Sequence, residues 1–126
     1  MEDIIFAREI PSGWKIVVLG DGARACTRAL TLSAIYPGCI YFIGSYPSIF
    51  ERLFDRRGIE RIRLPKDSDK YICVPMALYE FAHAHKDDTL FLLTVSELSN
   101  DIVMENKEHI EVFYLTDKEM LLKRSR

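Results

Sequence analysis

Short apolar runs alternate with amphipathic stretches along the chain, and this alternation predicts strands separated by helices. The runs at 15–20, 39–45 and 90–95 have the continuous apolar character of strands that are buried on both faces. Polar and apolar residues alternate over 60–64, which predicts a half-exposed edge strand, and 110–115 is a further candidate strand.

The segments between these strands have helical spacing. The first of them, 23–36, is followed by Pro37 and Gly38, which end a helix. We expect its apolar stripe, which faces the core, to consist of Cys26, Ala29, Leu30 and Ala34. The next segment begins at Ser48, whose spacing to Glu51 is that of a capping box.

Three more helices follow from similar signals. One of them either opens at Pro75 or begins near Ser68 and is kinked at the proline, so residues 66–75 have two interpretations. Ser99 is placed to cap a short helix, and Asp117 is placed to start a terminal one.

The alternation of strands and helices predicts an α/β fold over one domain, residues 1–126. We expect a three-layer α/β/α sandwich, Rossmann-like, with about five mainly parallel strands. If the strand order is 3-2-1-4-5, ligands would bind beyond the carboxyl ends of the strands, in the crevice between the first and the fourth. Residues 1–12 carry an apolar cluster for which the pattern predicts no single role.

Composition narrows the class of protein. The 126 residues are 48% apolar and carry a net charge of −2, which argues against a general attraction to nucleic acid. No apolar run approaches the ~18 residues of a membrane span, and the acidic start is unlike a secretory signal, so we expect a cytoplasmic protein. The absence of glutamine among many charges is a pattern reported for thermophile proteins. The three cysteines are an odd set without C-x-x-C spacing, and we expect no disulfide.

A glycine-rich turn lies between the first predicted strand and helix. It matches G-x-G-x-x-G/A and consists of Gly20, Asp21, Gly22, Ala23, Arg24 and Ala25. The first glycine permits a tight turn, the second lets a phosphate approach the backbone, and the small last residue lets helix and strand pack closely. Amides at the start of the helix would attract an anion.

Over this strand, turn and helix the chain resembles the Rossmann-like nucleotide-binding superfamily. The resemblance implies that Gly20, Gly22 and Ala25 form a phosphate-binding turn. The acidic residue that binds the ribose in that superfamily is missing, because Ser45 follows the second strand, so the standard NAD pattern is incomplete. Ser45, with Arg52 further along, would instead suit a phosphorylated ribose. The chain is also similar to small uncharacterised Rossmann-like proteins of thermophilic archaea, which implies no particular activity.

A structural interpretation of the same turn stands beside the functional one: the glycines make a tight connection and bind nothing. Arg24 and Arg28 lie in the first turns of the helix, where its dipole disfavours cations and a bound anion would offset that cost. Asp21, as the residue capping the helix, could pair with Arg24 and have the same effect.

Three side chains follow the fourth strand, opposite the glycine turn: Thr94, Ser96 and Glu97. The hydroxyls could contact a ligand, and Glu97 is the candidate general base. Helix capping is the commoner role of a serine such as Ser96.

Other polar clusters point to structure more than to chemistry. His83 and His85 follow a metal-motif spacing, but on a helix they lie about 200° apart and cannot share an ion, so we expect no metal. His85 would pack at the margin of the core and His83 would face solvent. The arginines between Arg52 and Arg63 alternate with acidic residues, as on a solvated surface.

Three functions remain open from the sequence. The first is a small binding module for a nucleotide or another phosphorylated ligand at the turn 20–25. The second is a homo-oligomeric subunit with no bound cofactor, whose interface would use aromatic residues such as Trp14, Tyr46, Tyr71 and Tyr79. The third is a small enzyme that uses Glu97 as acid or base.

Overall fold

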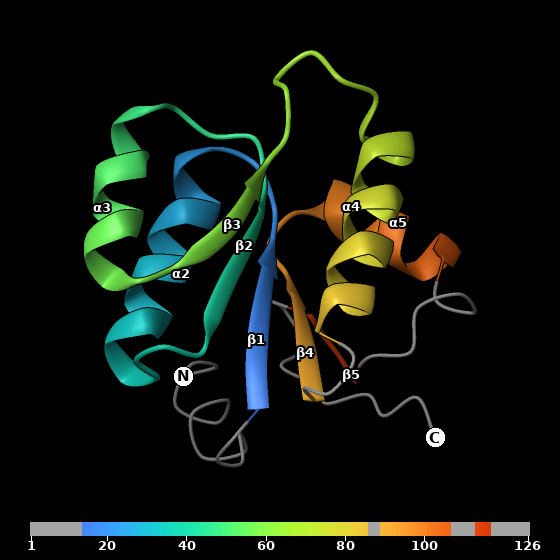
Figure 1. The fold of residues 1–126 in the computed structure, drawn as a ribbon. Coiled ribbons are helices and arrows are strands. Elements are labelled where there is room, and N and C mark those ends of the chain that lie inside the picture. The colour runs from blue at the N-terminus through green and yellow to red at the C-terminus, as the bar shows by residue number, and fades with distance from the viewer. Residues whose placement is uncertain (1–13, 86–88, 107–112, 117–126) are drawn as a thin grey trace.

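A parallel sheet with helices on both faces forms the described part of the protein (Figure 1). The computed structural model describes residues 14–85, 89–106 and 113–116. The strands are β1 (Trp14–Leu19), β2 (Ile40–Gly44), β3 (Glu60–Arg63), β4 (Thr89–Thr94) and β5 (Phe113–Thr116). The helices are α2 (Gly22–Ile35), α3 (Ile49–Arg57), α4 (Lys70–Ala84) and α5 (Glu97–Asn106).

The strand order is β3-β2-β1-β4-β5, and every pair is parallel. This is the order on which the predicted ligand position was made conditional, and the structure confirms an α/β fold with a parallel sheet. The strands β2, β1 and β4 carry the described core, while β3 pairs with β2 at one edge and β5 with β4 at the other. The edge position predicted for residues 60–64 is confirmed by β3, which pairs with β2 alone.

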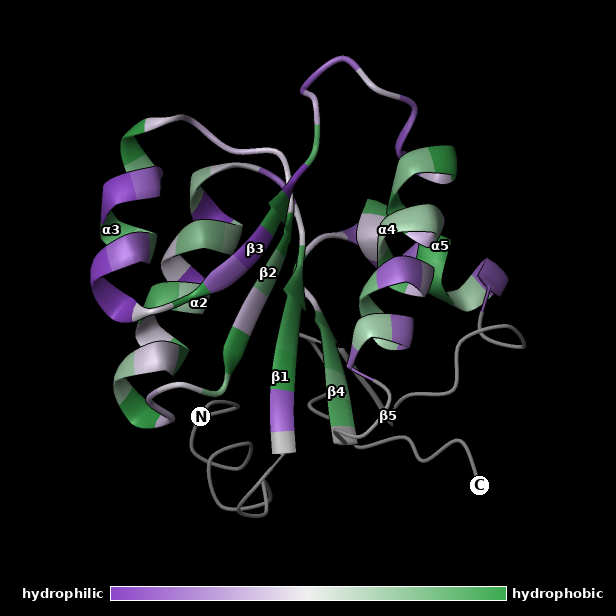
Figure 2. Ribbon diagram, viewed as in Figure 1, coloured by the Kyte–Doolittle hydropathy of each residue, from purple (hydrophilic) through white to green (hydrophobic). Residues whose placement is uncertain are grey.

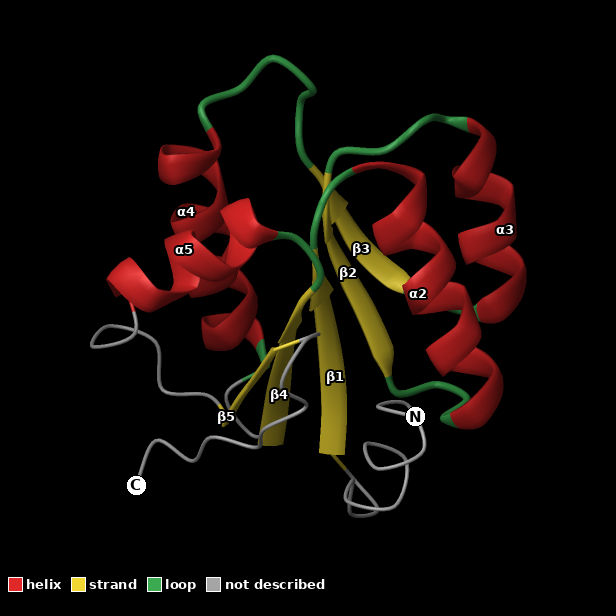
Figure 3. Cartoon of the chain, turned by 180° about the vertical axis from the view of Figure 1, so that it is seen from behind, coloured by secondary structure: helices red, strands yellow, loops and turns green. Residues whose placement is uncertain are grey.

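Alternate residues of each central strand face opposite sides of the sheet, as strand geometry requires. In β1, Ile16 and Val18 belong to the core under α2 and α3, whereas Val17 and Leu19 belong to the core under α4 and α5. The helices α2 and α3 cover one face and α4 and α5 the other, which is visible in Figure 1 and from behind in Figure 3. Covering of both faces suits the largely apolar sequences of the central strands β1, β2 and β4.

Several local predictions were wrong in detail. Ala34 is exposed, and Leu32 and Ser33 complete the buried face of α2 instead. Ser48 has helical backbone angles and makes no side-chain capping bond at α3, because the backbone N–H of Glu51 donates to the carbonyl of Ser48 at 3.0 Å. The carboxylate of Glu51, the other half of the expected capping box, binds arginines of β3. At α4 the alternatives are settled: the helix begins at Lys70.

Asp69 caps this helix, since its carboxylate accepts a hydrogen bond from the backbone N–H of Tyr71 at 3.0 Å. Pro75 lies inside α4. His85, at its end, stacks on Phe81 with ring centroids 4.1 Å apart, while His83 is exposed, as expected. The three cysteines are free thiols. The apolar cluster of residues 1–12 and the terminal helix predicted from Asp117 lie outside the described residues.

Candidate functional site

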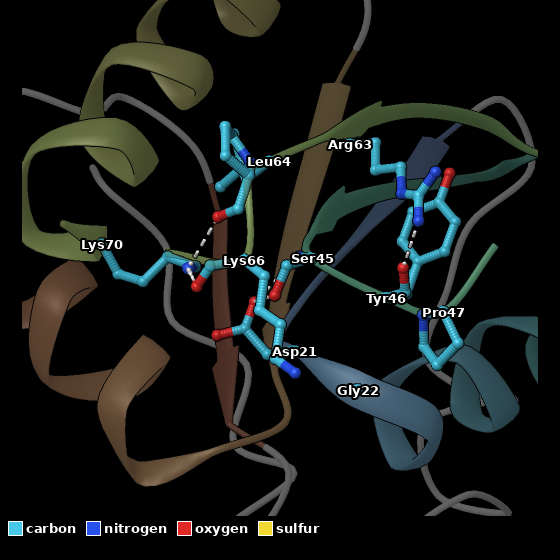
Figure 4. A pocket seen from close by; sticks show the side chains of 10 residues that line it. Asp21, Gly22, Ser45, Tyr46, Pro47, Arg63, Leu64, Lys66 and Lys70 are labelled. Carbon is cyan, nitrogen blue, oxygen red and sulfur yellow. Dashed lines mark hydrogen bonds between the residues drawn. The ribbon is translucent and has the colours of Figure 1, made fainter. Parts of the chain in front are cut away.

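A cleft of about 860 Å³ opens at the carboxyl ends of three neighbouring strands. Its walls come from the segment after β1, the segment after β2, and the end of β3 with the loop into α4 (Figure 4). The residues that line it are Asp21, Gly22, Ser45, Tyr46, Pro47, Arg63, Leu64, Pro65, Lys66 and Lys70. Carboxyl ends of parallel strands are where α/β proteins bind ligands, so the position suits a binding site.

Hydrogen bonds join the first two walls of the cleft. The carboxylate of Asp21 accepts the backbone N–H of Ser45 at 2.9 Å and the hydroxyl of Ser45 at 3.0 Å. In return, the backbone N–H of Gly22 donates to the carbonyl of Ser45 at 2.8 Å. Asp21 therefore holds the two loops together, and its side chain makes no capping bond to α2, contrary to the interpretation that paired it with the start of this helix.

The glycines of the turn act as the G-x-G-x-x-A spacing suggests. A Cβ at Gly20 would lie 3.0 Å from the Cβ of Ala25, so the two small residues allow the turn to pack against α2. Gly22 has a φ of +82°, a conformation that favours glycine, and a Cβ added there would meet no atom within 4 Å. The backbone at Gly22 therefore borders open space, while its N–H is used in the hydrogen bond to Ser45.

Three cationic side chains line the cleft, and they differ in what they already bind. The guanidinium of Arg63 donates to the carbonyl of Tyr46 at 2.8 Å and lies 4.9 Å from the centroid of its ring. The amine of Lys70 donates to the carbonyls of Pro65 and Lys66 at 3.1 and 3.2 Å, and so fixes the loop before α4. The amine of Lys66 has no hydrogen-bond or ion-pair partner within the described ranges, so it is the cation most available to a ligand.

Behind this wall, α3 is tied to β3 by an ion-pair network. Arg61 contacts the carboxylates of Glu51 and Asp55, each at 2.7 Å. The hydrogen bond from Arg61 lowers the pKa of Glu51, and burial raises the pKa of Tyr46. The hydroxyl of Tyr46 is buried, and none of the described groups forms a hydrogen bond with it. These contacts hold the β2–α3 loop in place and do not reach into the cleft.

Near the crevice predicted between β1 and β4, the described residues enclose a space of only about 10 Å³ at the ends of β1 and β2. Val74 of α4 and Leu98, Ser99 and Ile102 of α5 line its other side. A volume of this size holds about one water molecule. A ligand-sized space occurs on the other side of β1, over β2 and β3.

The three residues expected in that crevice have structural contacts. Thr94 is buried, and its hydroxyl donates to the side chain of Asn100 at 3.4 Å. Ser96 and Ser99 cap α5 reciprocally, each backbone N–H donating to the hydroxyl of the other at 3.1 Å. Glu97 is exposed in the first turn of α5 and does not line the cleft.

Of the ten residues proposed from the sequence, Asp21, Gly22 and Ser45 line the cleft. Gly20 and Ala25 are buried beneath the turn, while Ala23 and Arg24 are exposed on α2. Sequence reasoning missed the contribution of the loop after β3. The signal was available, since Lys66 closely follows a predicted strand, and the rule about carboxyl ends applies to every strand of the sheet.

Two negative findings concern the described residues alone. They contain no group of three metal-ligating side chains that could hold an ion. None of their helices is both long and apolar enough to cross a membrane.

At the level of architecture, the parallel sheet and its order agree coarsely with Rossmann-like topology. Comparison with known proteins adds no relative: no protein-family model, no curated protein and no solved structure matches the chain.

Proposed function

We propose that this protein is a binding module for a nucleotide or another phosphorylated small molecule, held in the cleft over β1, β2 and β3. The observation that carries the proposal is the meeting of two features in one space. The open backbone at Gly22 and the unpaired amine of Lys66 both border the cleft of about 860 Å³. Ligand sites of this kind measure roughly 300–1,000 Å³.

Charge in the cleft favours an anion. The lining has three cations, Arg63, Lys66 and Lys70, and one carboxylate, that of Asp21. This carboxylate already accepts two hydrogen bonds from Ser45, which stabilise its negative charge. Amides at the start of α2 add the positive end of a helix dipole. A ligand with at least two negative charges, such as a phosphate monoester, therefore fits best.

The remaining lining suits the uncharged part of such a ligand. Pro47 and Leu64 lie beside the cations (Figure 4), and Pro65 adds to this apolar part of the lining. A base or sugar can lie against surface of this kind while its phosphate contacts Lys66 and the turn. The strand order and the helices on both faces support the narrower assignment to a Rossmann-like three-layer sandwich.

Thermal unfolding with a panel of ligands tests the proposal. The panel contains ATP, AMP, NAD, NADP, pyrophosphate and inorganic phosphate. A ligand at 100 times its Kd stabilises the folded state by about 2.7 kcal/mol. For a domain of this size that corresponds to a rise in Tm on the order of 10 °C.

Two variants assign the shift to the cleft. Lys66→Gln removes the unpaired cation and should weaken the shift, whereas Arg57→Gln, an exposed arginine at the far end of α3, should leave it unchanged. The proposal fails if no compound in the panel raises Tm, or if both variants respond as the native chain does.

A further inference from the structure

The outward face of α4 carries a row of large apolar side chains. Ile72 is 58% exposed, Met76 65% and Tyr79 69%. The spacing of four and then three residues places them on one line along the helix, which we call the α4 seam. The opposite face of the helix, with Val74, Ala77, Leu78 and Phe81, is already buried against the sheet.

Because both faces are apolar, α4 has the composition of a helix that is buried on all sides. Figure 2 shows the contrast: α4 is coloured largely as apolar, whereas the outer face of α3 is largely hydrophilic. Nine large apolar side chains are exposed in the described ranges, and six of them belong to α4 and its neighbour α5. The exposed apolar surface is thus concentrated on one face of the molecule.

The area of this surface is that of an interface. With ~200 Å² for each fully exposed large side chain, the three seam residues expose on the order of 400 Å² of apolar surface, and all six residues of α4 and α5 on the order of 600 Å². The largest apolar patch of an ordinary monomer is about 300–600 Å², and each partner of a stable complex buries about 800 Å². The seam is therefore the centre of such an interface, and neighbouring residues of the α4–α5 layer must join it to reach the area that a stable dimer needs.

We propose that a second copy of this chain covers the seam, with the two α4 helices packed antiparallel about a two-fold axis. A 4-3 row of apolar residues is the packing surface of one helix against another. The next residue at this spacing is His83, so an antiparallel pair sets Met76 against the partner's Tyr79 and Ile72 against the partner's His83.

Charge also favours a second copy. Ile72, Met76 and Tyr79 carry no charge, so nothing along the seam repels an identical surface. In the antiparallel arrangement the end with Asp69 approaches the end with the partner's His83, and these two groups attract one another when the imidazole is protonated. The helix dipoles also oppose one another. A two-fold interface needs this self-complementarity.

Sedimentation equilibrium over a range of protein concentrations tests the dimer. The native chain should dimerise, and Met76→Lys or Tyr79→Lys should raise the dimer Kd at least about 100-fold, since the axis places each lysine in the interface twice. Ile49→Lys is the matched control: Ile49 is 73% exposed, but it lies on α3. Circular dichroism should show that all three variants are folded.

Disulfide crosslinking then tests the geometry, in a chain whose Cys39 and Cys73 are replaced by serine. Met76→Cys combined with Tyr79→Cys, which the axis sets opposite one another, should give a covalent dimer under mild oxidation, and Ile49→Cys should not. A native chain that is monomeric at every concentration overturns the proposal. So does a dimer that resists both seam variants but dissociates with Ile49→Lys.

Discussion

Gly44, the last residue of β2, lies directly against the carbonyl oxygen of Gly20, at the end of β1. A Cβ built on Gly44 would overlap this oxygen and the adjacent carbonyl carbon. The backbone N–H of Gly20 donates to the carbonyl of Ile43 at 3.3 Å, so the two chain segments continue to pair beyond the last residue of β1. The close approach brings the loops after both strands together at the cleft.

We expect Gly44→Ala to be the most destabilising single substitution around the cleft. The added methyl group meets backbone, which cannot rotate away, so unfolding by urea should show a loss of about 3 kcal/mol. Gly38→Ala is the control, because Gly38 has a φ of +78° and open space around it. Only backbone strain of about 1–2 kcal/mol is expected there. Equal losses in the two variants would contradict the steric explanation.

Asp21→Ala should loosen the connection between the first two walls of the cleft. It removes the acceptor of two hydrogen bonds and leaves the N–H of Ser45 without that partner, which lowers the free energy of unfolding by about 1–3 kcal/mol. Asp67→Ala, an exposed aspartate in the loop before α4, should have almost no effect on the same urea curve. A small effect at Asp21 would show that the loops are held mainly by the backbone bond of Gly22.

Stability at acid pH should depend on Glu51. The hydrogen bond from Arg61 lowers its pKa below the ordinary 4.5. A carboxyl group whose pKa is lower in the folded state adds stability above pH 4.5, and this stability is lost as the pH falls through the folded pKa. Glu51→Gln should therefore be less stable near neutral pH, by no more than about 1 kcal/mol because the pair is partly exposed, and should lose less on acidification.

Glu105→Gln, at an exposed glutamate of α5, is the control variant. Its free energy of unfolding should depend on pH as that of the native chain does. Urea unfolding at a series of pH values between 3 and 7 measures both variants. Parallel profiles for Glu51→Gln and the native chain would show that the ion pair with Arg61 does not contribute.

Cys26 should be the least reactive of the three thiols. It is fully buried in α2, and burial raises its pKa to about 11. Alkylation by iodoacetamide at pH 8 should modify Cys39 and Cys73 first, because they are partly exposed, and should reach Cys26 only on unfolding. Mass spectrometry of peptides from the native chain measures the order of modification.

The same burial predicts a loss of stability at alkaline pH. The pKa of Cys26 is higher in the folded state than in the unfolded state, so the neutral thiol stabilises the fold fully below pH 9.0. This stabilisation is lost as the pH rises towards 11. Cys26→Ala should remove this part of the alkaline slope, although it lowers stability at pH 7 by about 1 kcal/mol through lost packing. An unchanged slope in Cys26→Ala would assign the alkaline loss to other groups.

Much of the architecture could be predicted from local patterns. The runs at 15–20 and 90–95 became β1 and β4 because continuous apolar strands are stable only when both faces are covered. The strand order was only assumed from the sequence, and the structure supplied it. Capping predictions were less successful, because a side chain such as Glu51 or Asp21 binds whichever donor the fold brings near it. In both cases the donor is distant in sequence.

The aromatic residues proposed for an interface show the same limit. Tyr46 is buried, since its ring packs against Phe42 and Phe54, whereas Tyr71 and Tyr79 are exposed on α4. The side chain of Trp14 lies outside the described residues. Spacing along the sequence could not tell the buried aromatic residues from the exposed ones. On α4, both the face that packs against the sheet and the outward face are apolar.

The sequence by itself determined that this chain alternates strands and helices, and that a glycine turn follows the first strand. Hydrophobic periodicity is a property of a short segment, and backbone freedom is a property of a single residue such as glycine. Both can therefore be identified from the sequence whatever the fold is. Only the tertiary structure decided which strand ends remain open. Side chains of α4 and α5 leave only a small space on their side of the ends of β1 and β2, while the loops after β1, β2 and β3 leave a cleft. Packing of this kind depends on the volumes of side chains far apart in sequence, which no local pattern specifies.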